Sequence, residues 1–299
     1  MERASFPYQH SRGRSVTFVV TLSYRGLYNL GVNIETLVVT DLDGTLWFNG
    51  EEIHSDSLAA VEELKRRNIP LLVATGRRLR SVVEAFRRYE FRGQAVLLNG
   101  SLGYCFQRSE PFFLSDFPYT NETRLKEIFN ACSLSPCFYA DDSYVYVSSP
   151  TTSNGHLEVI GADLIEMDNL GLFPKDRKVL SFCILGIEKS LLQEAESIIS
   201  RESLGTVAYY EDKLFGGHSS MVQPPFTSKW TGVEKWCQYY DIVPSQVIAL
   251  GDAGNDKELL KGADIAMVVE DSEDYLMEMA DYVIPPPSKG GWAKILDLV

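Results

Sequence analysis

The sequence predicts an α/β protein whose parallel sheet is interrupted by an inserted α+β domain. Short apolar runs alternate with amphipathic segments from residue 36 to about residue 117, and the alternation resumes after residue 222. Alternating strands and helices are typical of a parallel sheet with helices on both faces. Residues 118–220 break this alternation, so we expect them to form a second domain within the first.

The spacing of apolar residues predicts the elements of the core. Leu58, Val61 and Leu64 recur at helical spacing, and Ser55 or Asp56 is the expected N-cap. Helices are expected at residues 55–68, 79–89, 231–240, 255–261, 272–279 and 291–298. Strands are expected at residues 36–40, 71–75, 95–99, 246–250, 265–269 and 281–284. Residues 46–54 leave room for only a short hairpin.

The inserted segment has helices and strands of its own. Apolar residues at helical spacing predict one helix around residues 125–132 and another around residues 191–198. Strands are expected at residues 144–148, 179–186 and 206–210. The expected division of the chain is an extension at 1–34, core halves at 35–117 and 221–299, and the insertion at 118–220.

Length and charge narrow the class of protein. A chain of 299 residues is long enough for about two domains. The net charge of −13 argues against nucleic acid or an anionic membrane as a partner, because both attract basic surfaces. No apolar run approaches the ~20 residues that span a bilayer. We therefore expect a monomer or homodimer that binds a small molecule.

The cysteines predict a reducing compartment. They are odd in number and lack the spacing of metal ligands. We expect buried thiols and a cytoplasmic protein, with a disulfide between Cys132 and Cys137 as the alternative. The five residues are Cys105, Cys132, Cys137, Cys183 and Cys237.

Residues 1–34 differ from the rest of the chain in charge. They carry four arginines against Glu2, a net charge of +3 that leaves −16 for the remainder. A targeting peptide, an upstream translation artefact and an extra strand are the alternatives. We expect a poorly ordered or peripheral extension, because the first strand begins cleanly near Thr36.

An acidic motif follows the first expected strand. The apolar run at 36–40 leads directly into Asp41-Leu42-Asp43-Gly44-Thr45. Open α/β sheets bind their ligands at the carboxyl ends of strands. Two carboxylates at this point, two residues apart, can both be brought to one substrate.

A second acidic motif follows another expected strand. Residues 247–250 are apolar and precede Gly251-Asp252-Ala253-Gly254-Asn255-Asp256. Carboxylates gathered in one cleft would repel an anionic substrate unless a cation intervened. Because the donors are hard oxygen atoms, Mg²⁺ is the expected metal.

Between these motifs lie Thr75, at the end of an expected strand, and Lys229, ahead of an expected helix. This order of motifs resembles the haloacid dehalogenase-like hydrolase superfamily over residues 36–299. The insertion matches the α/β (type IIB) cap of the Cof-type, sugar-phosphatase-like branch. The resemblance implies a Rossmann-like core and a Mg²⁺-dependent phosphatase that cleaves a small phosphate monoester, such as a sugar phosphate, through an aspartyl-phosphate.

The resemblance also implies roles for the acidic residues. Asp41 would be the nucleophile, and Asp43 the general acid and then base. Asp41, the Asp43 carbonyl and Asp252 would bind the metal. Asp256 and Asn255 would hold the water, the phosphate or Asp252 in position.

Further residues would bind the phosphate and the leaving group. Thr75 and the backbone near Gly76 would donate to a phosphoryl oxygen, and Lys229 would neutralise charge. Trp230 stands where the family usually has glycine, so Lys235 is the alternative lysine. Asn99 and Arg77 would lie near the substrate. In the cap, Lys213 and His218 are candidate leaving-group contacts, whereas Tyr209 and Tyr210 are expected in the strand core.

Two other functions use the same motifs. A phosphomutase would return the phosphoryl group to the sugar, and a non-catalytic sensor would bind a phosphorylated ligand without turnover. One further segment resembles the mannosyl-3-phosphoglycerate phosphatase branch, namely Pro285-Pro286-Pro287-Ser288-Lys289-Gly290-Gly291-Trp292. A mannosyl-3-phosphoglycerate-like conjugate is therefore an alternative substrate.

Overall fold

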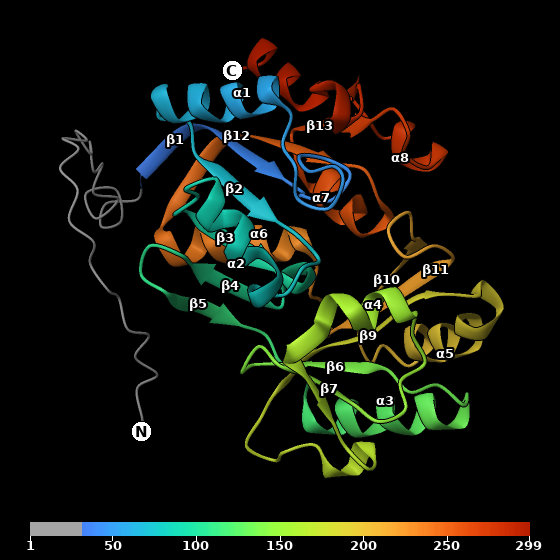
Figure 1. Ribbon diagram of the computed structural model, residues 1–299. Coiled ribbons are helices and arrows are strands. Elements are labelled where there is room, and N and C mark those ends of the chain that lie inside the picture. Colours follow the sequence, from blue (N-terminus) through green and yellow to red (C-terminus); the bar gives the residue numbers. More distant parts are fainter. Residues whose placement is uncertain (1–31) are drawn as a thin grey trace.

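The computed structural model describes residues 32–299 (Figure 1). The expectations for residues 1–31 lie outside the described residues. The first strand begins at Val32 rather than near Thr36, and Val32 pairs with Ile242 of β12. Residues 32–34 therefore belong to the core sheet and not to an extension.

The core contains a sheet in the order β14-β13-β12-β1-β2-β3-β4-β5. The strands from β14 to β3 are parallel, and β4 and β5 add an antiparallel edge. These strands are β1 (Val32–Thr40), β2 (Leu71–Ala74), β3 (Gln94–Leu97), β4 (Leu102–Cys105), β5 (Glu110–Leu114), β12 (Ile242–Gly251), β13 (Ile265–Val269) and β14 (Tyr282–Ile284).

Helices cover both faces of this sheet because successive strand residues point to opposite faces. In β1, Val38 packs into one apolar cluster, and Leu37 and Val39 pack into the other. The first cluster is covered by α1 (Ser55–Arg66), α2 (Leu79–Arg88) and the 3₁₀ segment η7 (Gly291–Asp297). The second is covered by α6 (Lys229–Tyr240), α7 (Lys257–Gly262) and α8 (Asp274–Met277).

The inserted domain, called the cap below, has a second sheet in the order β10-β11-β9-β6-β7-β8 (Figure 1). Its strands are β6 (Cys137–Ala140), β7 (Val145–Val147), β8 (Leu164–Glu166), β9 (Val179–Ile187), β10 (Thr206–Glu211) and β11 (His218–Gln223). Its helices are α3 (Tyr119–Ala131), α4 (Asn154–Ile160) and α5 (Lys189–Arg201).

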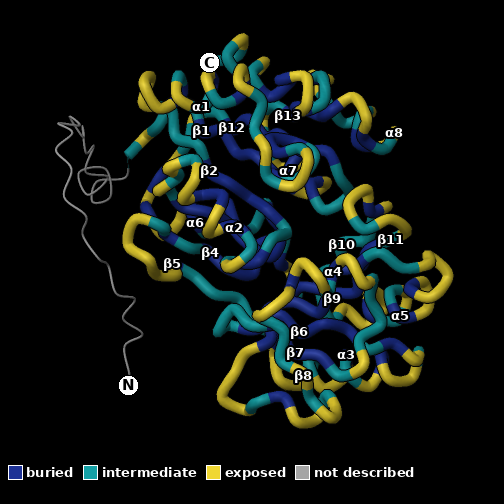
Figure 2. Tube along the Cα trace, in the orientation of Figure 1, coloured by how far each residue is buried: buried dark blue, intermediate teal, exposed yellow. Residues whose placement is uncertain are grey.

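The two faces of the cap sheet have different neighbours. Its outer face packs on α3 and α5 in a separate apolar cluster. Its inner face joins the apolar cluster of the core, so the cap lies against the core (Figure 2). The α/β class and the inserted domain predicted from the sequence are confirmed.

Several local predictions were wrong. The strand expected through residue 99 ends at Leu97, because the chain turns at Asn99 with a φ of 49°. The hairpin β4–β5 and the strands β6, β8 and β11 were not predicted. The last helix is 3₁₀ rather than α, and His54 caps α1 instead of Ser55 or Asp56. The expected boundary at residue 220 falls inside β11.

The short hairpin expected at residues 46–54 is present, with Phe48 and Glu52 exchanging backbone hydrogen bonds of 3.0 Å. The described cysteines are free thiols, and Cys132 and Cys237 are half-buried rather than buried. Among residues 32–299, no helix is long and apolar enough to span a bilayer.

Candidate active site

The two acidic motifs meet where the strand order of the core sheet reverses. β1 lies between β2 and β12, and Thr40 pairs with Leu250. The Asp41 N–H donates to the Leu250 carbonyl at 3.0 Å, which extends the ladder by one residue. Asp41 and Asp252 therefore leave neighbouring strands at the same edge, at the position where such sheets bind ligands.

Three carboxylates and one lysine form the centre of the site. One carboxylate oxygen from each of Asp41, Asp252 and Asp256 lies within 4.8 Å of the others. Lys229 Nζ donates to Asp41 Oδ1 at 2.8 Å and to Asp256 Oδ1 at 2.6 Å. All four side chains are buried, and Lys229 and Asp256 are 0% exposed.

The turn after Asp43 brings the two motifs into contact. Gly44 has a φ of +78°, and a Cβ added there would lie 2.3 Å from Asp252 Oδ2. Only glycine fits this conformation and this approach. Thr45 Oγ1 donates to Asp252 Oδ1 at 2.8 Å, a contact that the sequence analysis missed although Thr45 is part of the first motif.

Asp256 orders the second motif. Its Oδ2 accepts the N–H groups of Asp252 and Ala253, at 3.1 and 3.2 Å. Its Oδ1 accepts from Lys229, so both oxygens already have donors. Asp256 therefore fixes the position of Lys229 and of the loop that carries Asp252.

Burial and crowding of like charges raise the carboxyl pKa values. Burial, followed by the charge of Asp256, raises the pKa of Asp252 to about 7. Burial also raises the pKa of Asp41, although Lys229 opposes this effect. Burial alone would lower the pKa of Lys229, but the charges of Asp256 and Asp41 raise it. The lysine therefore stays charged, and the carboxyl cluster favours a further cation or a proton.

The start of α6 holds Lys229 in the site. Ser228 caps this helix and receives the N–H of Thr231 at 3.2 Å. Trp230 points to α7, where a Cβ added at Gly262 would lie 2.2 Å from its ring. Lys235 lies elsewhere on the helix and donates to Ser115 Oγ at 2.6 Å. The structure thus brings Lys229, and not Lys235, to the carboxylates.

Asp43 is paired with Arg77. The guanidinium donates to both carboxylate oxygens at 2.7 Å, and also to the Gly50 carbonyl at 3.0 Å. Its carbon lies 4.9 Å from the centre of the Trp47 ring. The Asp43 side chain is 36% exposed, so it stands at the opening of the site rather than within the buried cluster.

Thr75, Gly76, Asn99 and Asn255 form the other wall. The Thr75 carbonyl accepts the Asn99 N–H at 3.0 Å, and Asn255 Nδ2 donates to Asn99 Oδ1 at 3.2 Å. A Cβ added at Gly76 would lie 3.2 Å from Asn99 Oδ1 and 3.3 Å from Asn255 Nδ2. Thr75 Oγ1 also accepts the Arg77 N–H at 3.2 Å, so these residues are linked to the Arg77–Asp43 pair.

The cap residues that the sequence analysis singled out make different contacts. Lys213 Nζ donates to the Asp271 carbonyl of the core at 2.6 Å. His218 stacks on Tyr209 with ring centroids 5.3 Å apart. Tyr210 was expected in the strand core, but it is half-buried and its hydroxyl contacts Met221 Sδ at 3.8 Å.

Two arginines of the core hold the cap on another side. Arg78 is buried and donates to Asp163 Oδ2 and to the Ile160 carbonyl of the cap. Arg80 donates to Asp163 Oδ1 at 3.0 Å and lies over the Tyr144 ring. The sequence analysis did not find this contact, because the residues are more than 80 positions apart.

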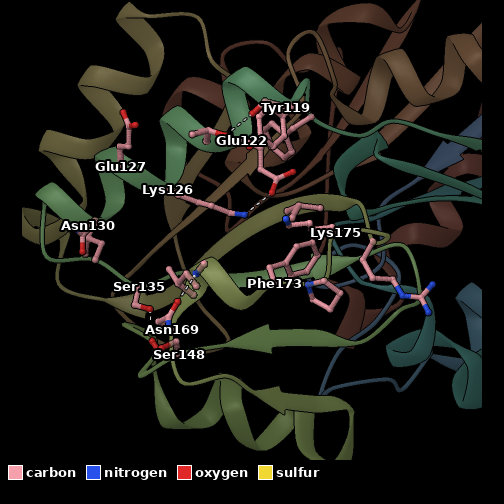
Figure 3. Close-up of a pocket in the computed structure, with 18 of the residues that line it drawn as sticks. Tyr119, Glu122, Lys126, Glu127, Asn130, Ser135, Ser148, Asn169, Phe173 and Lys175 are labelled. Atoms are coloured by element: carbon pink, nitrogen blue, oxygen red, sulfur yellow. Dashed lines mark hydrogen bonds and ion pairs between the residues drawn. The ribbon is translucent and has the colours of Figure 1, made fainter.

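A separate hollow of about 1160 Å³ lies in the cap between α3 and the segment before β9 (Figure 3). Lys126 is paired there with Glu122 at 2.6 Å and lies over the rings of Phe138 and Phe173. None of its lining residues belongs to the acidic cluster. The hollow is therefore separate from the groups at the carboxyl ends of β1 and β12.

The fold and the site define an α/β enzyme with an inserted cap and a buried carboxylate–lysine centre. A family model of haloacid dehalogenase-like hydrolases matches residues 38–296. The chain belongs to this family.

Similar proteins agree with this assignment. The chain is 23% identical to a phosphoglycolate phosphatase of Methanopyrus kandleri over 265 residues, covering 87% of this chain and 95% of the relative. It is 25% identical to an HMP-PP phosphatase of Yersinia pseudotuberculosis over 232 residues, covering 75% and 80%. A subclass IIB sugar phosphatase structure superposes with a TM-score of 0.70 at 18% identity, covering 88% and 98%. The fold is therefore that of the subclass IIB branch, as predicted.

Proposed function

We propose that the protein is a Mg²⁺-dependent phosphatase that hydrolyses a small phosphate monoester through an aspartyl-phosphate on Asp41. The observation that carries this proposal is the position of Asp41. It ends the central strand, faces a buried lysine, and lies within 4.8 Å of two further carboxylates. A carboxylate in this setting can attack phosphorus.

The donor set fits Mg²⁺. Asp41, Asp252 and the backbone carbonyl of Asp43 would hold the ion with hard oxygen ligands. Asp256 would position these ligands without binding the ion itself, because both its oxygens already accept hydrogen bonds. When bound, Mg²⁺ would neutralise charge on the phosphate and polarise its oxygens.

The two aspartates of the first motif would have different roles, one as the nucleophile and the other as the acid and base. Asp41 Oδ2, which accepts no hydrogen bond from the described residues, attacks phosphorus, and the bond to the leaving oxygen breaks. Asp43 protonates that oxygen. A water molecule then gives its proton to Asp43, attacks the aspartyl-phosphate, and releases inorganic phosphate. Asp43 must first leave Arg77 and take a proton from solvent before it can act as the acid, so the ion pair belongs to the resting state.

The rest of the opening would bind the phosphate. Thr75 Oγ1 and the N–H of Gly76 would donate to phosphoryl oxygens. Lys229 would neutralise negative charge on Asp41 and on the phosphate. Asn99 and Asn255 would hold the other wall. A sugar phosphate is the first substrate class to test, because the match to the sugar phosphatase with the similar fold covers 88% of this chain and 98% of that phosphatase.

The test is inorganic phosphate release from sugar phosphates, phosphoglycolate and an aryl phosphate, with and without Mg²⁺. Release should require both Mg²⁺ and Asp41, and Asp41→Asn should abolish it while the protein stays folded. Equal turnover by Asp41→Asn would refute the assignment of the nucleophile. Transfer of phosphate between sugars without net release would indicate the mutase.

A further inference from the structure

A buried tryptophan near the end of the chain contacts the strand that leads to the first acidic motif. The Trp292 side chain is 0% exposed and belongs to the apolar cluster that η7 and α1 form with β1. Its Nε1 donates to Thr40 Oγ1 at 2.9 Å. Thr40 is also 0% exposed, and its side chain is on the same face of β1 as that of Val38, because side chains alternate along a strand. This contact joins residues 252 positions apart and ends one residue before Asp41.

Two glycines allow the segment before Trp292 to fold in this way. Gly290 has a φ of +71°, and a Cβ added there would lie 2.6 Å from His54 Nδ1. A Cβ added at Gly291 would lie 1.8 Å from the Pro285 carbonyl oxygen. Because glycine alone fits both positions, the turn that brings the indole to β1 depends on this pair.

The hydroxyl of Thr40 continues the contact to the backbone of Asp41. Thr40 Oγ1 donates to the Asp41 carbonyl at 2.7 Å. An indole N–H can only donate, whereas a hydroxyl both donates and accepts. The indole therefore donates to the hydroxyl, and the hydroxyl donates to the carbonyl. Hydrogen bonds in such a chain strengthen one another.

The Asp41 carbonyl needs this donor because the ladder between β1 and β12 ends there. Thr40 pairs with Leu250, and the Asp41 N–H donates to the Leu250 carbonyl. In a continued parallel ladder the next bond would run from the Asp252 N–H to the Asp41 carbonyl. The Asp252 N–H instead donates to Asp256 Oδ2 at 3.1 Å. The Thr40 hydroxyl thus replaces the missing ladder donor at the point where the two strands separate around the site.

The direction of the Asp41 side chain depends on this carbonyl. Asp41 Oδ1 accepts from Lys229 at 2.8 Å, which leaves Oδ2 for the attack. The Asp41 N–H is held by β12, so the carbonyl is the remaining backbone anchor of the nucleophile. Attack requires an accurate distance and line of approach, since a displacement of about 1 Å can lower the rate about 100-fold.

We propose that Trp292 is a positioning residue for the nucleophile, which acts through Thr40 to fix the Asp41 carbonyl and thereby the line of attack of Asp41. The inference rests on the proposed phosphatase function. It adds a residue from the end of the chain that touches neither the substrate nor the metal.

The test removes the chain of hydrogen bonds from both ends. Trp292→Phe removes the N–H and keeps an aromatic ring in the apolar cluster. Thr40→Val removes the hydroxyl at nearly constant volume. Each variant should lower kcat for an aryl phosphate about tenfold and leave KM within about twofold, because the groups that bind the substrate are unchanged. The double variant should also lose about tenfold rather than about 100-fold, because both changes break the same chain.

Two further variants are the controls. Thr40→Ser keeps the hydroxyl and should bring kcat back to within about threefold of the wild-type value. Trp236 is also buried, at 3% exposure, but its Nε1 has no partner among the described residues. Trp236→Phe should therefore leave kcat and KM within about twofold. Urea denaturation of each variant measures the folded fraction to which kcat refers.

The outcomes separate the two proposals. A merely structural role of Trp292 would lower the free energy of unfolding and leave kcat of the folded Trp292→Phe variant unchanged, which would overturn the positioning role while the phosphatase stands. A loss of about 100-fold in the double variant, or a Thr40→Ser variant as slow as Thr40→Val, would also overturn it. If Trp292→Phe folds poorly, the two Thr40 variants still decide the question. Absence of Mg²⁺-dependent and Asp41-dependent release from every ester by the wild-type protein would overturn the proposed function, and the positioning role with it.

Discussion

Replacing Lys229 by methionine tests the charge balance of the site. The ammonium is 0% exposed and lies 2.8 Å from Asp41 and 2.6 Å from Asp256, so neither carboxylate can be satisfied by solvent. Removing one partner of a buried ion pair costs about 3–5 kcal/mol. Lys229→Met keeps the unbranched stem of the side chain as far as Cε and removes the ammonium, so we expect the free energy of unfolding to fall by that amount at pH 7.

The loss of stability in Lys229→Met should be smaller under two conditions. Acidic pH reduces it, because protonated carboxyl groups need no cation. Mg²⁺ should also restore part of the stability by supplying positive charge to the same cluster. Urea denaturation at pH 5 and pH 7, with and without Mg²⁺, measures the free energy of unfolding, and phosphate release gives the accompanying loss of turnover.

Lys235→Met is the matched control on the same helix. Its ammonium contacts Ser115 and the Phe113 ring, and it has no carboxylate partner among the described residues. We expect the free energy of unfolding to fall by less than about 1 kcal/mol and phosphate release to be retained. A loss below 1 kcal/mol for Lys229→Met, or equal losses for the two variants, would refute the reasoning.

Two further predictions concern the cap. Asp163→Asn removes the charge that holds the buried Arg78, so the docking of the cap on the core should weaken by about 2 kcal/mol and kcat/KM should fall roughly 30-fold. The exposed Asp168→Asn is its control, and equal effects would contradict the prediction. Burial, then the charge of Arg78, lowers the pKa of His156 from 6.5 to about 4, so the native state binds fewer protons than the unfolded chain in that range. The free energy of unfolding should therefore fall by about 3 kcal/mol as pH falls from 6.5 to 4, and urea denaturation should show that His156→Gln lacks this part of the pH dependence.

The core was predictable where the pattern is local and regular. β1 and β12 are apolar runs that end at acidic motifs, so the sequence predicts both the strands and the carboxylates at their ends. The hairpin β4–β5 was missed because its strands are short and one of them begins with Glu110-Pro111. The last helix is 3₁₀ rather than α, a difference that apolar spacing does not resolve over seven residues.

The site was predictable in its residues but not in their pairings. Asp41 and Asp43 are two positions apart, yet one turns inward to Lys229 and the other outward to Arg77. Trp230 is compatible with Lys229 because its ring packs over Gly262, which nothing in the local sequence indicates. Tyr210 was expected in the strand core because residue spacing does not say which face of the cap sheet meets the core.

The sequence by itself determined the α/β class, the inserted domain and the chemical groups available at the ends of two strands. These follow from periods of about two and 3.6 residues and from short motifs, which act within a few positions of the chain. The tertiary structure alone decided that Lys229 meets Asp41, 188 positions away, and that Lys213 of the cap meets the core at Asp271. Such contacts depend on strand order, register and the packing of the cap on the core, which local periodicity does not encode.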